Sequence, residues 1–399
     1  MMIYRSAISF LMLLICFTGF AQRKAGKTAF ILLDEQALYN FKQLYQNKDT
    51  AMLAQVTPLI ANADSLLNTG PYSVTFNKTK VAPSGDKHDY VSQAPYWWAD
   101  SSKKDGKPYI RKDGRRNPEI YLLHDDSQMG QLCSSVQQLT LAWYFTGNEK
   151  YTQKIKTLLQ VWFIAPATRM NPNLNYAQYI PGLNDGRGIG IIETAGLTVI
   201  PDMLAVLQSN PNINSSLVSG VKQWYKQYLN WLLTSKNGKS EQNQINNHGT
   251  YYDMQVVDFA LFTGNNALAK STLQSSTIPR IDQQFTTDGA QPLELIRTKS
   301  WGYANMNLWG WCRLAKMAEL VNVDLWHEQT IDGKGIKTAI NWLIPYALNK
   351  KTWNHEQIEP ITYGTFTRIV HAAADVYPDD IFKQYLNQHP LKKQLQNIN

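Results

Sequence analysis

The sequence FTGN stands at residues 145–148 and again at residues 262–265, each time between two runs rich in apolar residues. In both copies the third residue is the glycine, Gly147 or Gly264, and it follows a stretch with helical periodicity. A glycine here ends a helix because it readily adopts the left-handed backbone conformation of a C-cap. The repeat therefore predicts helical hairpins that share one stop signal.

Helical periodicity extends through most of the chain. Apolar residues recur three and four positions apart, and few stretches alternate as a strand would. We expect an all-α fold, and repeated hairpins favour an (α/α)n toroid, an incomplete barrel whose inner helices line a central cleft. An ordinary helical bundle with two similar turns is the alternative. The segments with helical spacing are 34–45, 52–67, 128–145, 151–163, 191–207, 217–233, 252–262, 306–320 and 336–348.

The first residues have the features of an export signal. Arg5 precedes an apolar run at 8–16, and residues 19–21 read GFA, which offers small residues at a cleavage site. The run is too short for a convincing membrane span. We expect a signal peptide at 1–21, one domain over 22–399, and a periplasmic or secreted protein without stable membrane insertion. A lipid anchor on Cys16 is the alternative.

Cysteine and histidine usage argues against a scaffold of disulfides or metals. Removal of the signal leaves Cys133 and Cys312, too few for a disulfide framework and unlike a metal site in spacing. No pair of histidines has the spacing of a zinc motif. We therefore expect a stable apolar core, and neither a metal nor another cofactor.

The charge and aromatic content point to an anionic glycan as partner. The formal net charge is +8, which attracts polyanions at long range. Nucleic acid is not expected, because the basic residues are scattered and no cluster tracks phosphates. The 12 Trp and 21 Tyr suit the faces of sugar rings, although most of them are expected to pack the core. The composition does not indicate an oligomeric state.

One long region interrupts the helical pattern. Residues 71–117 are rich in Gly, Pro, Asp, Lys and Tyr, and a compact domain usually keeps such a loop when it has a function. We refer to this region as the excursion, and we expect it to form a wall or lid of the substrate cleft.

Two segments carry the residue types needed for a proton-transfer reaction. The first, INNHGTYYD at 245–253, precedes a helical run, and the second is DGAQPLELIRTKSWGYANMNL at 288–308. Amide, imidazole, guanidinium and phenol together suit β-elimination from a uronic acid, in which the carboxylate is neutralised, a base removes the C5 proton and an acid protonates O4. The alternative is that an Asn only caps a helix and His248 is a surface residue.

These blocks resemble the alginate lyase superfamily, specifically the branch of polysaccharide lyase families five and thirty-eight. The resemblance implies an α/α toroid and cleavage of uronic-acid glycans to 4,5-unsaturated ends. It covers roughly residues 80–310. The motifs that carry it are SGDKHDY (84–90), YWW (96–98), NPE (117–119), GRGIGIIE (186–193), NNH (246–248) and the block 288–303, with weaker likeness in WNHEQI (353–358).

The resemblance also implies roles for four residues. Asn247 and Arg297 would neutralise the substrate carboxylate, and His248 would be the base for the epimer that eliminates anti. Tyr303 would be the acid, and would act as both base and acid in syn elimination. The WGYAN spacing around Tyr303 is closer to family thirty-eight than to family five, which favours a broader or different uronan specificity over a mannuronate preference.

Further residues are candidates for substrate contacts, each with an equally good structural explanation. Basic and amide side chains would bind carboxylates or line the cleft, and aromatic ones would stack on sugars. Glu193 is expected either in the cleft or as a buried partner of Arg187. The candidates are Lys87, Tyr96, Trp97, Trp98, Gln178, Arg187, Asn246, Tyr251 and Tyr363.

Two other functions fit parts of the pattern. A glycoside hydrolase on the same fold would need two opposed carboxylates, and a non-catalytic glycan-binding protein would explain the aromatic motif at 96–98. The second alternative gives no reason for His248 and Tyr303. The carboxylates available to a hydrolase are Asp86, Glu193, Asp253, Asp288 and Glu294.

Overall fold

The computed structural model describes residues 30–390. The predicted signal peptide at 1–21 and the alternative anchor at Cys16 lie outside these residues. One hydrophobic core cluster runs through the described part, from Ile31 near its start to Tyr385 near its end.

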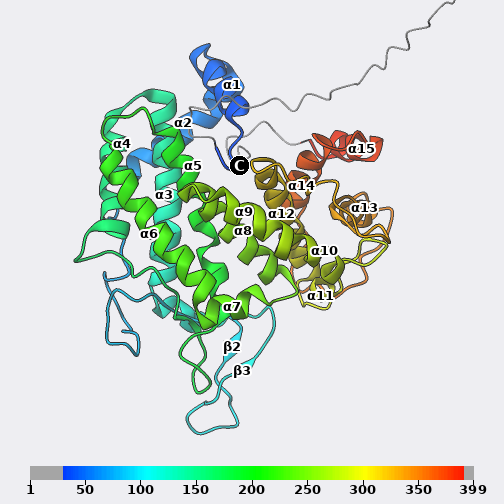
Figure 1. Cartoon of the computed structure of the whole chain (residues 1–399), viewed down its shortest axis with the longest axis horizontal. Helices are drawn as coiled ribbons and strands as arrows, with labels where there is room; N and C mark the ends of the chain where they lie inside the picture. Colours follow the sequence, from blue (N-terminus) through cyan, green and yellow to red (C-terminus); the bar gives the residue numbers. More distant parts are fainter. Residues whose placement is uncertain (1–29, 391–399) are drawn as a thin grey trace, which may run out of the picture.

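Helical hairpins follow one another around a ring (Figure 1). The inner helices are α3 (Asp125–Thr146), the 3-10 helix η3 (Gly188–Thr198) with α5 (Val199–Val206), α8 (Asn247–Thr263), α12 (Ser300–Glu319) and α14 (Gly364–Ala374). Each inner helix packs against the next, α3 against η3 and α5, η3 against α8, α8 against α12, and α12 against α14. The predicted all-α toroid is confirmed.

The remaining elements form the outer layer and the excursion. The other helices are α1 (Glu35–Gln46), α2 (Thr50–Leu66), η1 (Pro118–Leu122), α4 (Glu149–Leu159), η2 (Gln160–Ile164), α6 (Ser215–Thr234), α7 (Lys236–Gln242), α9 (Asn266–Thr272), η4 (Leu273–Thr277), α10 (Ile278–Gln284), α11 (Pro292–Leu295), α13 (Ile336–Ala347) and α15 (Asp380–Gln388). The strands are β1 (Val91–Gln93), β2 (Trp97–Trp98), β3 (Ile110–Arg111) and β4 (Tyr176–Tyr179).

The glycine stop signals work as the repeat predicts. Gly147 caps α3 with φ of 70°, and Gly264 caps α8 with φ of 82°, both in the left-handed region. The nine predicted segments all form helices, although 191–207 begins as a 3-10 helix. The polar stretch 236–243 shows no helical pattern of apolar residues, and no helix is predicted there. These residues form α7, which has little apolar surface but buries Gly238 and Glu241.

Buried polar side chains fix the register of the inner helices α8 and α12. The Oε1 atom of Gln284 on α10 accepts hydrogen bonds from Thr250 on α8 at 3.0 Å and from Asn307 on α12 at 2.9 Å. The indole of Trp311 donates to the same atom at 2.9 Å. Because buried polar groups are costly when left without partners, this network favours a single alignment of the three helices.

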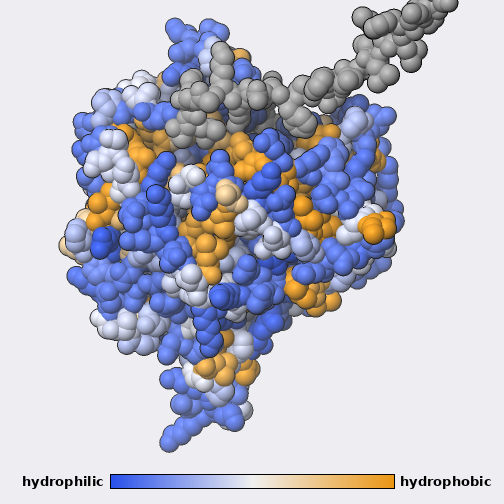
Figure 2. Space-filling view, in the orientation of Figure 1, coloured by the Kyte–Doolittle hydropathy of each residue, from blue (hydrophilic) through white to orange (hydrophobic). Residues whose placement is uncertain are grey.

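The excursion is irregular, as expected, with three short strands. β1 pairs with β4 in parallel, and β2 pairs with β3 in an antiparallel hairpin. In Figure 1 the end of this hairpin projects beyond the helices, and in Figure 2 the projecting tip is hydrophilic. The hairpin therefore extends from the same end of the ring as α7 and α11.

Among residues 30–390, one helical stretch, Gly188–Val206, has the length and composition to cross a bilayer, and 67% of its most apolar window is buried. It is an inner element of the toroid, and burial on all sides accounts for its apolar sequence. The two cysteines in the described part, Cys133 and Cys312, are both free and buried.

Candidate active site

The inner helices α8 and α12 begin at the same end of the ring, beside α7 and α11 (Figure 1). Helix N-termini carry partial positive charge and unpaired N–H groups, so this end favours anionic ligands. The NNH motif lies at the start of α8, and Tyr303 lies in the first turn of α12. The two predicted blocks thus meet at one end of the toroid.

His248 is oriented by a buried carboxylate. Its Nδ1 atom lies 2.7 Å from Oε1 of Glu241, and the two side chains are 14% and 1% exposed. An ionised carboxylate can only accept, so Nδ1 carries the proton and the free Nε2 is the atom that can take another. His248 is therefore not a surface residue. The Oε2 atom of Glu241 is buried and has no hydrogen-bond partner among residues 30–390.

The two asparagines of the motif have different tasks. Asn246 caps α8, because its side chain accepts a hydrogen bond from the backbone N–H of His248 at 3.2 Å. Asn247 is 1% exposed and donates to Glu294 on α11 through its backbone N and its Nδ2, both at 2.7 Å. Its Oδ1 atom is buried and accepts no hydrogen bond from the described part of the chain. The capping role expected as the alternative holds for Asn246.

Arg280 holds the junction between α7 and α8 in place. Arg280 donates to the backbone oxygens of Gln242 and Gln244, both at 2.6 Å, and to the buried carboxylate of Asp253 at 2.7 Å. A Cβ atom on Gly249 would lie 2.0 Å from the oxygen of Gln244 and 2.3 Å from Nη1 of Arg280, so only glycine fits there. This packing holds Glu241 and His248 in position relative to each other.

Arg297 is held by the excursion. Its Nε and Nη2 atoms donate to Asp113 at 3.1 and 2.9 Å, and Asp113 also accepts from the backbone N of Thr298. Burial alone would raise the pKa of Asp113, but the hydrogen bonds from Arg297 and Thr298 hold that pKa well below its ordinary value. Nη1 of Arg297 forms no hydrogen bond with a described residue and remains available to a ligand.

Tyr303 lies between Arg297 and the excursion. The guanidinium carbon of Arg297 is 3.7 Å from the centre of the Tyr303 ring, and the Tyr303 hydroxyl donates to the hydroxyl of Tyr96 at 2.9 Å. Burial raises the pKa of Tyr303 well above its ordinary value, the bond to Tyr96 adds to this, and the charge of Arg297 opposes it. The phenol is therefore protonated near neutral pH, as an acid must be.

Glu294 connects the two halves of the site electrostatically. Burial raises its pKa, while hydrogen bonds from Asn247 and the nearby charges of Arg297 and His248 lower it. Arg297 and His248 therefore both act on the same buried carboxylate. The structure brings the predicted set of Asn247, His248, Arg297 and Tyr303 into one neighbourhood, although their catalytic roles stay predictions.

Arg187 and Gln178 lie in a neighbouring cluster. Nη2 of Arg187 donates to Oε1 of Gln178 at 2.7 Å, and burial lowers the pKa of Arg187 to about 10. Glu193 raises that pKa by its charge, yet it hydrogen-bonds to the hydroxyls of Tyr90 at 2.9 Å and Ser92 at 2.6 Å. Glu193 is thus a nearby charge and not the direct ion-pair partner expected for Arg187.

The remaining sugar-contact candidates do not form one surface. Trp98 donates its indole N–H to the backbone of Arg115 in the excursion, and Trp97 pairs there as part of β2. Tyr251 is 9% exposed and its hydroxyl bonds to the backbone of Met306, so it packs between α8 and α12. Tyr363 packs against Trp301 at the start of α14, and Lys87 is exposed without an ion pair to a described carboxylate.

The sequence did not identify three residues that hold the site. Glu241, Glu294 and Asp113 are the partners of His248, Asn247 and Arg297. Glu294 was considered only as a hydrolase carboxylate, and the other two were not singled out. Their separation from their partners in the chain reaches 184 residues for Asp113, so no local spacing pointed to them.

Each carboxylate available to a hydrolase accepts hydrogen bonds in the described structure, and two of them are fully buried. Asp253 is 0% exposed and paired with Arg280, and Glu294 is 1% exposed and paired with Asn247. Asp288 accepts from Thr286 and Trp342, and Asp86 accepts from Asn171. Within residues 30–390, no group of three or more His, Cys, Asp or Glu side chains is arranged to hold a metal ion.

Comparison with known proteins agrees with this geometry. A family model described as alginate lyase matches residues 73–353. The crystal structure of an alginate lyase from Bacteroides ovatus is 35% identical, with a TM-score of 0.86, over 92% of this chain and 98% of that chain. A search of curated proteins found no match.

Alginate lyase A1-III from Sphingomonas species A1 shares the fold. Its crystal structure has a TM-score of 0.53 at 14% identity, over 90% of this chain and 93% of that chain. A histidine-to-alanine variant of that lyase, complexed with a tetrasaccharide, has a TM-score of 0.54 at 15% identity, over 89% of this chain and 92% of that chain.

Proposed function

Since the chain belongs to the alginate lyase family and is a polysaccharide lyase, we propose that it cleaves alginate or a closely related uronan by β-elimination. The products carry a 4,5-unsaturated uronate at the new non-reducing end. The observation that carries the proposal is the stacking of Arg297 on Tyr303 at 3.7 Å. It sets a group that neutralises a carboxylate directly beside a protonated phenol.

Carboxylate neutralisation falls to Arg297 and to the second Nδ2 hydrogen of Asn247, since the backbone N and the first Nδ2 hydrogen of Asn247 donate to Glu294. Nη1 of Arg297 has no described partner, and the N-terminus of α8 adds partial positive charge. Withdrawing charge from the substrate carboxylate makes the C5 proton more acidic, because the enolate-like intermediate places its negative charge on the same group. Asp113 keeps the guanidinium plane in place during this step by its contacts with Nε and Nη2.

Proton removal from C5 falls to Nε2 of His248 in anti elimination. Glu241 fixes the tautomer and stabilises the imidazolium that forms, as a carboxylate does beside a catalytic histidine. The C5–H bond breaks, its electrons form the C4–C5 double bond, and the bond from C4 to O4 breaks.

Protonation of the leaving O4 falls to the hydroxyl of Tyr303. Its raised pKa keeps the proton on the phenol until O4 becomes basic as the bond breaks. In syn elimination Tyr303 would serve as base and acid in turn, which requires the proton to leave first. For that proton to pass to Tyr96, which accepts the hydrogen bond from Tyr303, the Tyr96 hydroxyl must in turn release its own proton to bulk water.

The proposal also assigns a role to the excursion and a cellular location to the protein. Tyr96 and Asp113 both belong to the excursion and contact Tyr303 and Arg297, which supports its role as the wall of the cleft. We also propose that residues 22–399 form one exported catalytic domain. A periplasmic or secreted location fits a polymer that is met outside the cytoplasm.

The test is an activity screen of the purified enzyme. Poly-mannuronate, poly-guluronate, glucuronan and pectate are incubated separately, and the ultraviolet absorbance of the conjugated unsaturated uronate is followed. We expect the signal with at least one alginate block type. Reducing ends released without that absorbance would indicate hydrolysis and contradict the proposed elimination.

A further inference from the structure

A cavity lies on the face of the small parallel sheet opposite the Arg187 cluster. The pairing of β1 with β4 is irregular, and neighbouring side chains on each strand have partners on different sides of the sheet. Ser92 on β1 bonds to Glu193, and Gln178 on β4 bonds to Arg187, which places the Arg187 cluster on one face. Their neighbours Gln93 and Tyr179 bond to each other and line a cavity of about 670 Å³ on the opposite face.

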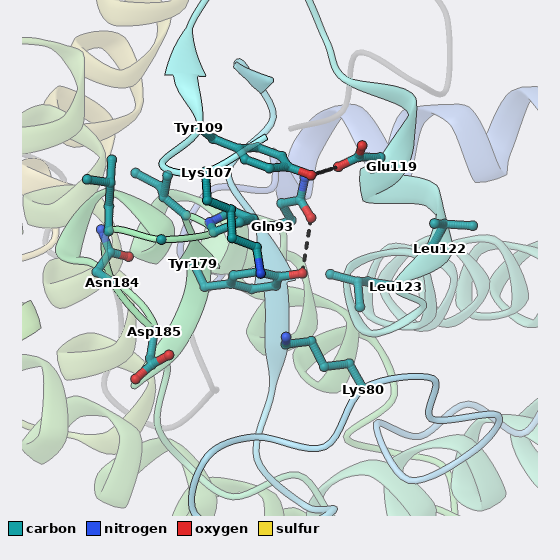
Figure 3. Close-up of a pocket in the computed structure, with 14 residues that line it drawn as sticks. Lys80, Gln93, Lys107, Tyr109, Glu119, Leu122, Leu123, Tyr179, Asn184 and Asp185 are labelled. Atoms are coloured by element: carbon teal, nitrogen blue, oxygen red, sulfur yellow. Dashed lines mark hydrogen bonds between the residues drawn. The ribbon is translucent and has the colours of Figure 1, made fainter. Parts of the chain in front are cut away.

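The cavity is large enough for several sugar units, because small-molecule pockets occupy roughly 300–1,000 Å³. Figure 3 shows polar and aromatic side chains converging on it from the excursion and from the segment after β4. The residues that line it are Lys80, Gln93, Lys107, Tyr109, Glu119, Leu122, Leu123, Tyr179, Ile180, Pro181, Gly182, Leu183, Asn184 and Asp185.

Two lysines give the cavity its positive groups. Lys80 and Lys107 are exposed, and neither forms an ion pair with a described carboxylate. The amine of Lys80 lies 4.3 Å from the centre of the Tyr179 ring, and Figure 3 shows both lysine side chains directed toward the region of that ring. Two amines without carboxylate partners beside an aromatic face suit an acidic sugar.

Two carboxylates line the cavity, Glu119 and the exposed Asp185, and Glu119 is already engaged. Oε2 of Glu119 accepts from the hydroxyl of Tyr109 at 2.8 Å and from Nε2 of Gln93 at 3.1 Å (Figure 3). Burial, with the bond to Glu119, raises the pKa of Tyr109 to about 12, so this phenol keeps its proton. The network holds the Tyr109 ring in place and leaves the lysines free to bind a ligand.

Apolar side chains at the rim complete the site. Leu122 is 67% exposed and Leu183 is 52% exposed, and both line the cavity. Exposed leucines beside tyrosine rings provide contact for the C–H faces of sugar rings. The combination of amines, rings and apolar rim fits an acidic oligosaccharide better than an inorganic anion.

We propose that this cavity is a second uronan-binding site, which holds a distant part of the same polymer while another part occupies the catalytic cleft. The inference rests on the proposed function for the identity of the polymer. Both sites share the excursion, since Tyr96 contacts Tyr303 and Tyr109 lines the cavity. A long chain that reaches both sites gains affinity through the high effective concentration of its second segment, and a short oligomer gains none.

The test compares the Lys80→Gln/Lys107→Gln double variant with the wild-type enzyme on long alginate and on a tetrasaccharide. We expect KM for the polymer to rise about tenfold, with kcat unchanged and with kcat/KM for the tetrasaccharide unchanged. The matched control is Lys103→Gln/Lys104→Gln, which removes the same charge from exposed positions of the same excursion. This control should keep the wild-type KM.

A binding measurement separates this proposal from the proposed reaction. The binding measurement uses the Tyr303→Phe enzyme, because binding does not require turnover. In this background, affinity for long alginate should fall about tenfold when Lys80 and Lys107 are replaced. The second site would be overturned if replacing Lys103 and Lys104 lowered polymer affinity as much as replacing Lys80 and Lys107. It would also be overturned if replacing Lys80 and Lys107 left polymer affinity unchanged. An enzyme that binds long alginate through these lysines but releases no unsaturated product would overturn the reaction alone and support the site.

Discussion

The imidazole Nδ1 of His248 lies 2.7 Å from Oε1 of Glu241, a carboxylate whose side chain is only 1% exposed. The pair joins the end of α7 to the start of α8, and the contacts of Arg280 prevent this junction from opening. Glu241 thereby decides which nitrogen of His248 faces the substrate. It is a positioning residue, because it acts through His248.

Replacing Glu241 with Gln should slow catalysis without unfolding the protein. Gln keeps an acceptor oxygen for Nδ1 but loses the charge that stabilises the imidazolium, so kcat on guluronate-rich oligomers should fall about 10- to 100-fold with a similar KM. Steady-state kinetics measures this. The control is Asp324→Asn, which alters the exposed pair of Asp324 with His327 and should leave kcat unchanged. An unaffected kcat in Glu241→Gln would contradict the positioning role.

Replacing Tyr303 with Phe should nearly abolish turnover on every substrate. The ring and its contact with Arg297 remain, but the hydroxyl that protonates O4 is lost, and a residue that serves as base and acid contributes about 10³-fold or more. Tyr96→Phe removes only the partner of that hydroxyl, so its loss should be much smaller. Turnover above a few per cent in Tyr303→Phe would show that another group is the acid.

Replacing His248 with Ala should separate the two epimers. If His248 is the base only in anti elimination, activity on guluronate-rich oligomers should fall about 10²- to 10⁴-fold. Activity on mannuronate-rich oligomers, which eliminate syn, should fall much less because Tyr303 can act alone. Initial rates on both oligomers test this, and an equal loss on the two would refute the division of roles.

Catalysis should not need a divalent metal, because Arg297 and Asn247 neutralise the substrate carboxylate. Incubation with a chelator, followed by a rate measurement, should leave at least most of the activity. A calcium-dependent lyase treated in parallel confirms that the chelator works. A strong loss that calcium or manganese restores would require a different neutralising group.

The stability of the protein should depend on the titration of Glu193. Burial, with repulsion from Asp126, raises the pKa of Glu193 to about 7 in the folded protein, against hydrogen bonds from Ser92 and Tyr90. A carboxyl with a raised folded pKa binds more protons when folded, so stability falls as pH rises from about 4.5 toward 7 and stays lower above it.

Glu193→Gln should therefore stabilise the protein at pH 8 relative to wild type, by roughly 1–3 kcal/mol, with little difference at pH 4.5. Urea unfolding at the two pH values measures the difference. Glu149→Gln serves as control, because hydrogen bonds lower the pKa of Glu149, so its replacement should not stabilise the protein at high pH. A Glu193→Gln variant with the same loss of stability as wild type between the two pH values would contradict the raised pKa.

The sequence by itself determined where most helices lie and where they stop. Spacings of three and four place apolar side chains on one face of a helix, and Gly147 and Gly264 end α3 and α8 at the predicted positions, because both effects act within a few residues. The sequence also placed the NNH motif and Tyr303 near helix starts. The helix α7 escaped prediction, since its burial depends on Gly238 and Glu241 and not on an apolar stripe.

Only the tertiary structure decided which side chains face each other. Asn247 and Glu294 are 47 residues apart in the chain, and Arg297 and Asp113 are 184 apart. Such pairs form when separate hairpins pack around the ring and when the excursion folds against α12. The local spacing of apolar residues in the sequence therefore does not predict them. The same packing placed Ser92 and Gln93 on opposite faces of one sheet, which separates the Arg187 cluster from the lysine-lined cavity.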